Sequence, residues 1–371
     1  MKQTAKLRST TSLGSGSHPY NLRRTSFTKP VLFHEAVFLQ SVIFSEATFG
    51  SDVEFFRAHF RGGADFLSTG FAGIADFTQA RFDGVLDIGD SLFEKEAIFV
   101  QVTVYGEAGF INNGFEAGAD FSWVNIQKDA RLFFSDSDLS QCSFSDTDLE
   151  RVEFIDVEWY RPAVWKWYKR RRKALWDEFR PFEEDEQARN YERIAASYRQ
   201  LVLNYEGKRD FESAEDFHFG EMEIRRKKVG SKLRSRTLRT IMGYLNIFNI
   251  YKIFSLYGTS YWVAAGWLAC FVFLAFPLAF LLSGFNINQA NIGSIGSTIQ
   301  YEMRFDPGRL GNFVSDYIKA VGFSLSTATL QKSRSYEPSG LLTSFWMSVE
   351  SIVTAAQSAL LFFALRRRFK R

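Results

Sequence analysis

The sequence predicts a multidomain chain in which a region of stacked repeats and an α-helical hairpin precede an α-helical membrane domain. Three observations support this fold class. Phe accounts for 40 of 371 residues, and the excess lies in the repeat region. Two long apolar stretches follow residue 258. Charge is also segregated, because residues 31–160 carry 7 basic and 23 acidic side chains, whereas residues 161–239 carry 21 basic and 14 acidic.

Residues 1–30 contain six basic side chains, no acidic side chain and no apolar core. A segment of this composition cannot bury enough apolar surface to fold, so we expect a disordered basic tail. The two cysteines of the chain, Cys142 and Cys270, provide no disulfide framework. This cysteine usage indicates a reducing cytosol for the soluble part of the protein.

Residues 31–158 contain apolar residues at steps that alternate between five and six. The resulting period of eleven fits neither an α-helix nor a simple strand, and it indicates a repeat architecture. Of 18 repeat centres, 14 are Phe, and the residue two before the centre is Ala in ten cases. After a slip near Ser137 the step becomes five. We expect the following centres to be buried: Phe38, Phe44, Phe49, Phe55, Phe60, Phe66, Phe71, Phe77, Phe82, Ile88, Phe93, Phe99, Val104, Phe110, Phe115, Phe121, Ile126 and Leu132, then Leu139, Phe144, Leu149 and Phe154.

The A-x-F units, such as GADFLSTGF and AGADFSW, resemble those of the pentapeptide-repeat family. The resemblance implies a right-handed quadrilateral β-helix with the central Phe or Leu and the small residue pointing inward. Sides of five or six residues give about 20 to 22 residues per coil, and coils stack about 4.8 Å apart. Quinolone-resistance members of the family use an acidic β-helix to imitate DNA. We interpret the acidic surface here as ordinary solubility, so a nucleic-acid partner is not expected.

Residues 159–257 predict a basic and aromatic linker, a helical hairpin and an interfacial helix. The run WYRPAVWKWYKRRRKALWDEF mixes Trp with a block of basic residues, which predicts membrane contact or capping of the rod's end. Apolar residues at helical spacing predict two helices with a turn at Gly207. The stretch Tyr198–Lys227 looks like the hairpin that joins pentapeptide repeats to membrane spans in multidomain members of the family. Glu221 and Arg225 are spaced to form an ion pair.

Residues 258–371 predict a two-span membrane domain. Tyr261–Phe285 and Leu341–Leu365 each exceed the roughly 20 residues that a helix needs to cross a bilayer. Pro277 is expected to bend the first span. Lys and Arg crowd both flanks, so the positive-inside rule places both termini in the cytoplasm. We therefore expect a multi-pass protein of the inner (plasma) membrane.

Between the spans, DYIKAVGFSLSTATLQ is too short and too polar to cross a bilayer, and it has the pattern of a re-entrant pore helix. Two spans around such a helix resemble the two-helix potassium-channel pore, which implies a homo-oligomer with a tetramer favoured. A potassium filter reads T-V-G-Y-G, and its glycines let the carbonyls face the ion. The candidate loop has no glycine, so potassium selectivity is not expected. It comprises Ser326, Thr327, Ala328, Thr329, Leu330 and Gln331.

The second span carries a polar stripe formed by Glu350, Thr354, Gln357 and Ser358. An ionisable group within a membrane span usually faces a partner side chain or a water-filled cavity. Two interpretations remain open: a buried hydrogen bond between helices, or a group that lines a pore.

The four His residues are scattered, and the sequence has neither a Gly-rich phosphate loop nor a nucleophile elbow. We therefore expect no enzyme, no cofactor and no metal. The first functional hypothesis is a homo-oligomeric, channel-like membrane protein with a cytosolic β-helix for sensing or interaction. The alternative is a non-conducting, membrane-anchored scaffold that binds a cytosolic protein partner through the β-helix. The expected partners are the lipid bilayer, further copies of the chain and this unidentified protein.

Overall fold

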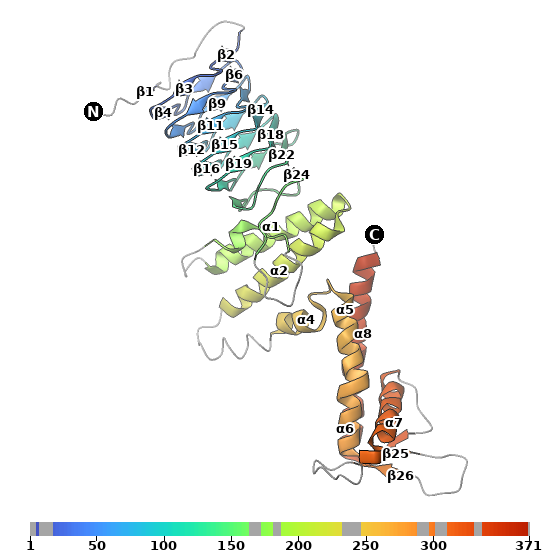
Figure 1. Ribbon diagram of the computed structural model, residues 1–371. Coiled ribbons are helices and arrows are strands. Elements are labelled where there is room, and N and C mark those ends of the chain that lie inside the picture. The colour runs from blue at the N-terminus through green and yellow to red at the C-terminus, as the bar shows by residue number, and fades with distance from the viewer. Residues whose placement is uncertain are drawn as a thin grey trace. The chain divides into compact units, whose positions relative to one another are not determined.

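The computed structural model describes residues 5–6, 18–162, 172–180, 187–231, 246–287, 297–300, 310–329 and 336–369. The chain divides into two compact units, Met1–Thr240 and Ile241–Arg371. The first unit contains a β-solenoid of about six turns followed by helices, and the second contains helices and one small sheet (Figure 1).

The β-solenoid is built from short parallel strands in four sheets. The first sheet contains β1 (Ala5–Lys6), β4 (Val31–Leu32), β8 (Val53–Glu54), β12 (Ala75–Asp76), β16 (Ala97–Ile98), β20 (Ala119–Asp120) and β23 (Cys142–Ser143). The second contains β2 (Tyr20–Asn21), β6 (Val42–Ile43), β10 (Ala64–Asp65), β14 (Leu86–Gly89), β18 (Glu107–Ile111), β22 (Arg131–Ser135) and β24 (Val152–Ile155). The third contains β3 (Ser26–Phe27), β7 (Thr48–Phe49), β11 (Gly70–Phe71), β15 (Leu92–Phe93) and β19 (Gly114–Phe115). The fourth contains β5 (Val37–Phe38), β9 (His59–Phe60), β13 (Arg81–Phe82), β17 (Thr103–Val104) and β21 (Asn125–Ile126).

Each coil of the regular part takes 22 residues. Ala64 pairs with Leu86, and Leu86 pairs with Ala108, each 22 positions further along the chain. A residue in the left-handed backbone region recurs every eleven positions, as at Glu46 (φ 59°) and Arg57 (φ 53°). These non-glycine residues lie within the five-residue steps, whereas the residues with positive φ in the six-residue steps of the regular coils are the glycines Gly63 and Gly118. The alternation of five and six therefore reflects two kinds of corner.

The core of the solenoid is a set of stacked phenylalanine ladders. The rings of Phe55, Phe77, Phe99 and Phe121 follow one another with centroids 4.8 Å apart, which is the spacing of neighbouring strands. All 18 predicted repeat centres, and the four that follow them, are buried. The predicted burial pattern and the predicted coil length are thus confirmed.

The slip in the repeat lies earlier than predicted. Leu132 pairs with Ala108, and Phe134 pairs with Phe110, so this coil takes 24 residues. Leu132 therefore occupies the position two before the centre, although it is buried, and Phe134 is the centre. The sequence pattern misplaced it because Leu132 stands six residues after Ile126, the ordinary step.

The solenoid also begins earlier than the predicted boundary at residue 31. Strands β2 and β3 lie within the range predicted as a disordered tail, and Tyr20, Leu22 and Phe27 pack against the core. The disordered tail was predicted from the basic composition of residues 1–30. Tyr20, Leu22 and Phe27 instead extend the stacked core of the solenoid by part of a coil. Of residues 1–17, only β1 lies within the described part of the chain.

The helical part of the first unit consists of a 3₁₀ turn, η1 (Trp176–Glu178), and two helices, α1 (Gln187–Gly207) and α2 (Phe211–Ser231). The two helices match the predicted hairpin, and α1 ends at the predicted turn residue. Tyr198 and Phe217 are fully buried between them and belong to the same apolar core as the solenoid. The predicted pair also forms, with Arg225 Nη2 lying 2.5 Å from Glu221 Oε1.

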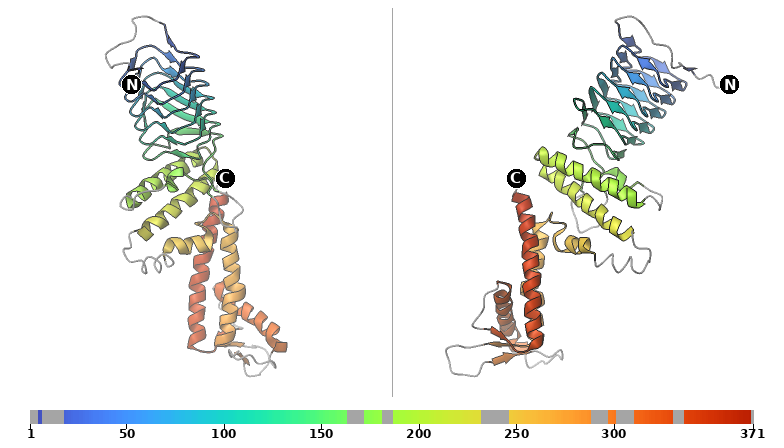
Figure 2. Two further views of the ribbon diagram at one scale, coloured as in Figure 1. Left: turned by 60° about the vertical axis from the view of Figure 1, so that its left-hand side comes forward. Right: turned by 180° about the vertical axis from the view of Figure 1, so that it is seen from behind.

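The second unit contains α4 (Ile247–Ser255), α5 (Tyr261–Cys270), a π-helical turn η2 (Phe271–Ala275), α6 (Phe276–Ser283), α7 (Leu310–Ala328) and α8 (Leu341–Phe369). Its antiparallel sheet has β25 (Phe285–Ile287) between β26 (Ser297–Ile299) and β27 (Tyr336–Pro338). α5, η2 and α6 form one continuous rod that runs beside α8 (Figure 2). Tyr261–Ser283 and Leu341–Arg367 are long and apolar enough to cross a membrane. The first stretch ends two residues before the predicted end of the span.

Candidate functional site

The candidate site lies where η2, α7 and α8 meet, and it begins with Pro277. Proline has no backbone N–H, so it cannot donate to the carbonyl of Phe273, four residues earlier. The chain forms a π-helical turn just before it, in which the N–H of Phe276 donates to the carbonyl of Phe271. The carbonyl of Val272 therefore loses its usual donor as well, and its π-helical alternative would be Pro277 itself.

Two hydroxyl groups of α7 replace these missing donors. The Tyr317 hydroxyl donates to the carbonyl of Phe273, and Ser324 Oγ lies 2.8 Å from the carbonyl oxygen of Val272. Tyr317 and Ser324 stand seven residues apart and so share one face of α7. Backbone groups freed by a proline can be satisfied by a neighbouring helix, which is the role that α7 has here.

Ser324 connects the same point to α8. Its hydroxyl is also within hydrogen-bond distance of Oε1 of Glu350. Glu350 is 0% exposed, and its second carboxyl oxygen, Oε2, has no hydrogen-bond partner in the described part of the chain. One serine therefore links the π-helical turn before Pro277 with an ionisable group of α8.

Gln357 ties α8 to two other helices. Its Nε2 atom donates to the carbonyl of Ala264 in α5 at 2.8 Å and to the carbonyl of Phe254 in α4 at 3.0 Å. These carbonyls lie near the ends of the short connection between α4 and α5. The contact therefore fixes α4 against the two long helices.

The predicted polar stripe divides into a buried part and an exposed part. Glu350, Thr354 and Gln357 are buried, whereas Ser358 is exposed. Thr354 bonds to the carbonyl of Glu350 in its own helix. Of the two open interpretations, a hydrogen bond between helices describes Glu350 and Gln357.

The candidate loop is not brought together as a site. The hydroxyls of Ser326 and Thr327 donate to the carbonyl of Phe323, at 2.7 and 3.1 Å. The hydroxyl of Thr329 donates to the carbonyl of Leu325 at 2.7 Å. The first two bonds lie within α7, and the third joins the residue that follows α7 to it. α7 begins earlier than the predicted pore helix and ends at Ala328. Leu330 and Gln331 lie outside the described residues.

A buried ionic cluster in the first unit was missed in the sequence. Glu178, with a side chain 2% exposed, lies 2.6 Å from Arg172 Nη2 and 3.0 Å from Lys227 Nζ, and it accepts a bond from the Tyr198 hydroxyl. Burial raises the pKa of Tyr198, and the neighbouring Glu178 charge acts in the same direction. The cluster joins η1, α1 and α2. In the sequence, Arg172 stands within a block of basic residues, and nothing there distinguishes it from its neighbours as the partner of a buried carboxylate.

The last coil of the solenoid is covered by side chains of η1 and α1. Asp177 accepts bonds from the backbone N–H of Phe144 at 3.1 Å and the hydroxyl of Ser145 at 2.8 Å. Asn204 donates to the carbonyls of Leu149 and Val152, both at 2.7 Å. Burial raises the pKa of the Asp177 carboxyl. These bonds take the place of a further coil, so capping is the role that the structure shows for the described part of the basic and aromatic segment.

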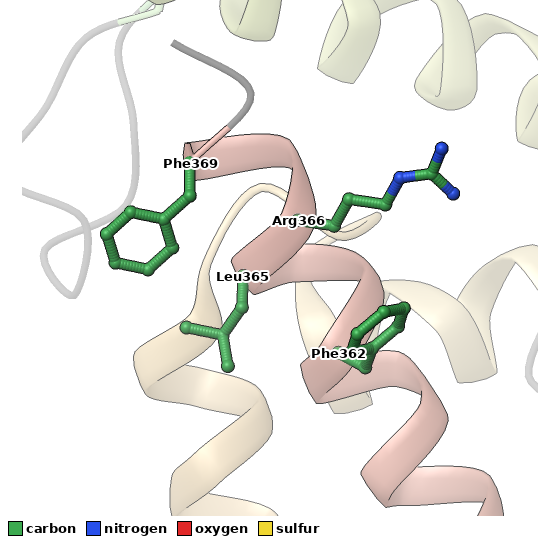
Figure 3. Close-up of a pocket in the computed structure, with 4 residues that line it drawn as sticks. All are labelled: Phe362, Leu365, Arg366 and Phe369. Carbon is green, nitrogen blue, oxygen red and sulfur yellow. The ribbon is translucent and has the colours of Figure 1, made fainter.

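A shallow hollow near the end of α8 offers no comparable arrangement. It is lined by Phe362, Leu365, Arg366 and Phe369, all from one helix. The four side chains lie on one face of the helix, with Leu365 and Phe369 toward the left and Phe362 and Arg366 toward the right in the view of Figure 3. A single helix cannot enclose a ligand, so we assign no site here.

Comparison with known proteins concerns the solenoid. Residues 22–70 match the family described as pentapeptide repeats (9 copies). No curated protein and no solved structure matches the chain. The resemblance of the membrane domain to a channel pore therefore stays a prediction. Residues 22–70 are therefore similar to pentapeptide repeats, and they form part of a β-solenoid that is followed in the chain by a helical region with two helices that could span a membrane.

Proposed function

We propose that this chain is an integral protein of the inner (plasma) membrane, with both termini in the cytoplasm and the solenoid as a cytosolic interaction domain. Large apolar side chains face outward on the two long helices, including Trp262 (72% exposed) and Ile352 (71% exposed). Such exposure is unusual for a soluble protein and is expected for side chains in lipid. The basic residues that flank both helices support the orientation.

The observation that carries the proposal is the course of the chain around α7. β25 follows α6 and pairs with β27, which precedes α8, so the chain leaves the first span and enters the second at the same edge. α7 lies between these strands in the sequence. Its Ser324 nevertheless contacts Val272, which is in the middle of the first long helix. A segment that enters and leaves on one side while reaching mid-depth is a re-entrant helix.

The function that fits this arrangement is that of a homo-oligomeric, channel-like protein with no enzymatic activity, in which a tetramer is favoured. α7 keeps an apolar outer face, with Val314 67% and Ile318 65% exposed, which neighbouring copies or lipid would cover. Glu350 and Gln357 are used within one chain, so any pore wall must come from other residues. The four parallel sheets support a quadrilateral form for the right-handed solenoid, whose faces would bind a cytosolic protein.

Membrane topology is the first test. Single cysteines at Asn312, in the first turn of α7, and at Glu337, in β27, should both react with an impermeant maleimide added outside intact cells. The background would carry Cys142→Ala and Cys270→Ala. Ser358→Cys serves as the matched control within a span. Reaction of Asn312 and Glu337 from opposite sides would exclude a re-entrant α7.

Oligomeric mass and conductance are the second test. Light scattering on protein in detergent should give a tetramer, and planar-bilayer recordings should give either no current or one that discriminates poorly between potassium and sodium. The candidate loop lacks the glycines that let every carbonyl face an ion. A monomer would instead indicate the non-conducting, membrane-anchored scaffold. A current that follows the potassium gradient alone would contradict our interpretation of the loop.

A further inference from the structure

The hydroxyl group of Ser324 has fewer protons than the acceptors that surround it. A serine hydroxyl has one proton, yet Ser324 Oγ has two acceptors within reach, the Val272 carbonyl and the Glu350 carboxyl. Val272 cannot obtain a proton from its own helix, because Phe276 donates elsewhere and Pro277 has none to give. The proton of Ser324 is therefore committed to Val272.

With its proton committed, the oxygen of Ser324 faces Glu350 as an acceptor. An ionised carboxylate offers only acceptors, so two lone pairs would face each other at this contact. A protonated carboxyl resolves the conflict, because its O–H donates to Ser324 while Ser324 donates to Val272. The count balances only when Glu350 brings one proton of its own.

The surroundings of Glu350 provide no counter-charge. Lys319 of α7 forms an ion pair with Asp316, with a separation of 3.1 Å, and Tyr317 donates to a backbone carbonyl. Among the described residues, no Lys, Arg or His lies within ion-pair distance of Glu350. The other titratable or charged side chains that the structure describes on α8, on the elements packed around it and in their connections are Tyr251, Lys252, Tyr257, Tyr261, Cys270, Tyr336, Glu337, Arg366 and Arg367. A buried carboxylate without a partner is strongly disfavoured.

We propose that Glu350 is a proton-binding site, which holds a proton at neutral pH and donates a hydrogen bond to Ser324 Oγ, while the hydroxyl proton of Ser324 is donated to the carbonyl of Val272. This chain of two hydrogen bonds joins α8, α7 and η2. Loss of the proton removes the first bond and leaves a charge that no described group balances, so the seating of α7 against both long helices depends on proton binding. The site requires neither a pore nor an oligomer, and therefore goes beyond the function proposed above.

Infrared spectroscopy of the purified full chain tests the proposal, because the carbonyl band of a neutral carboxylic acid is separate from the bands of carboxylates. At neutral pH the wild-type protein should show this band, and Glu350→Gln should lose that part of it. Asp177→Asn is the control for a second buried carboxyl, and Glu337→Gln is the control for an exposed one. Neither control should change the part that Glu350→Gln removes.

A second variant keeps the test independent of how Glu350→Gln folds. Ser324→Ala retains the carboxyl but removes its acceptor, so the neutral-acid band of Glu350 should move to higher frequency. If the spectra of wild type and Glu350→Gln differ only in carboxylate bands, Glu350 is ionised and the proposal is wrong. A neutral-acid band that Ser324→Ala leaves unmoved would likewise overturn the proposed bond to Ser324.

Discussion

The solenoid and the second unit satisfy buried backbone carbonyls with the same chemistry but on different scales. In the solenoid, Thr69, Ser91 and Asn113 stand 22 residues apart, and each donates to a carbonyl 25 residues earlier, at 3.0, 2.6 and 2.8 Å. The backbone N–H of Thr69 also donates to Ser91 Oγ, and the backbone N–H of Ser91 donates to Asn113 Oδ1, so the three residues form a ladder. In the second unit, Tyr317 and Ser324 perform this role at one turn, η2, which has no counterpart elsewhere in the described residues.

The difference teaches how each region bears the loss of one side chain. A solenoid coil contacts only its neighbours, so damage to one rung is confined to adjacent coils. The contact of Ser324 joins three helical elements at a single point, so its loss affects all three. Repetition thus limits damage in the first unit, whereas the second depends on contacts that occur once.

The largest expected effect is a cavity in the phenylalanine ladders. Phe66→Ala should lower the free energy of unfolding of the solenoid by about 3 to 5 kcal/mol, because Phe66 is 0% exposed and its stacked neighbours cannot fill the space. Urea unfolding of the full chain, followed by hydrogen exchange of solenoid amides, measures it. Asp65→Asn, the adjacent outward residue, should change the value by less than about 0.5 kcal/mol. Equal effects of the two would refute the assigned register.

The cap should be the next most sensitive feature. Asn204→Ala leaves the buried carbonyls of Leu149 and Val152 without their side-chain donor, which should cost about 1 to 3 kcal/mol. Exchange should increase most in the last coil, near β23 and β24. Leu203→Ala, on the exposed side of the same helix, is the control. Uniform exchange throughout the solenoid would show that damage is not confined to adjacent coils.

Ser324→Ala tests the membrane unit. Loss of one hydrogen bond between membrane helices should cost about 1 kcal/mol, measured by unfolding in mixed micelles. Ser348→Ala removes an exposed hydroxyl that bonds within α8 and should have little effect. Exchange should increase in η2, α7 and α8 together. An increase limited to α7 would contradict the view that one serine holds three elements.

The smallest effect concerns the first coils of the solenoid and depends on pH. Hydrogen bonds from Arg24, which has the larger effect, and from Arg23 lower the pKa of Glu46 from its ordinary 4.5 to about 2. The folded form therefore binds this proton less readily than the unfolded form. Its stabilisation is present above pH 4.5 and is lost as the pH falls toward about 2. Glu46→Gln should flatten this part of the acid dependence in thermal melts, whereas Glu96→Gln should not. An unchanged acid dependence in Glu46→Gln would rule out the assigned contribution.

The sequence predicted what the molecule repeats. The coil length and the burial of the centres could be derived because each is encoded many times, so one irregular position did not obscure the period. The prediction of Leu132 as a repeat centre was wrong because the two-residue insertion in that coil occurs only once and so leaves no repeated pattern. The left-handed corners at Glu46 and Arg57 gave no residue-type signal, although their spacing was already visible in the alternation of five and six.

The membrane site could be predicted only in part. Pro277 and Glu350 stand out in apolar stretches, and both were identified. Their connection through Ser324 depends on how α7 packs, which no local pattern encodes. Arg172 and Glu178 show the same limit in the first unit, because a charged residue inside a basic block has the same composition whether it faces solvent or a buried partner.

The 22-residue coil makes the length and the angular phase of the rod separately adjustable. Ala64 and Leu86 occupy the same place in successive coils, so deleting residues 64–85 would join equivalent backbone positions and shorten the rod by about 4.8 Å. Everything downstream would keep its angular setting. Deleting eleven residues instead would join opposite sides of the coil and turn the downstream surface by half a revolution. A binding partner that contacts one face would tolerate the first deletion and meet the opposite face after the second.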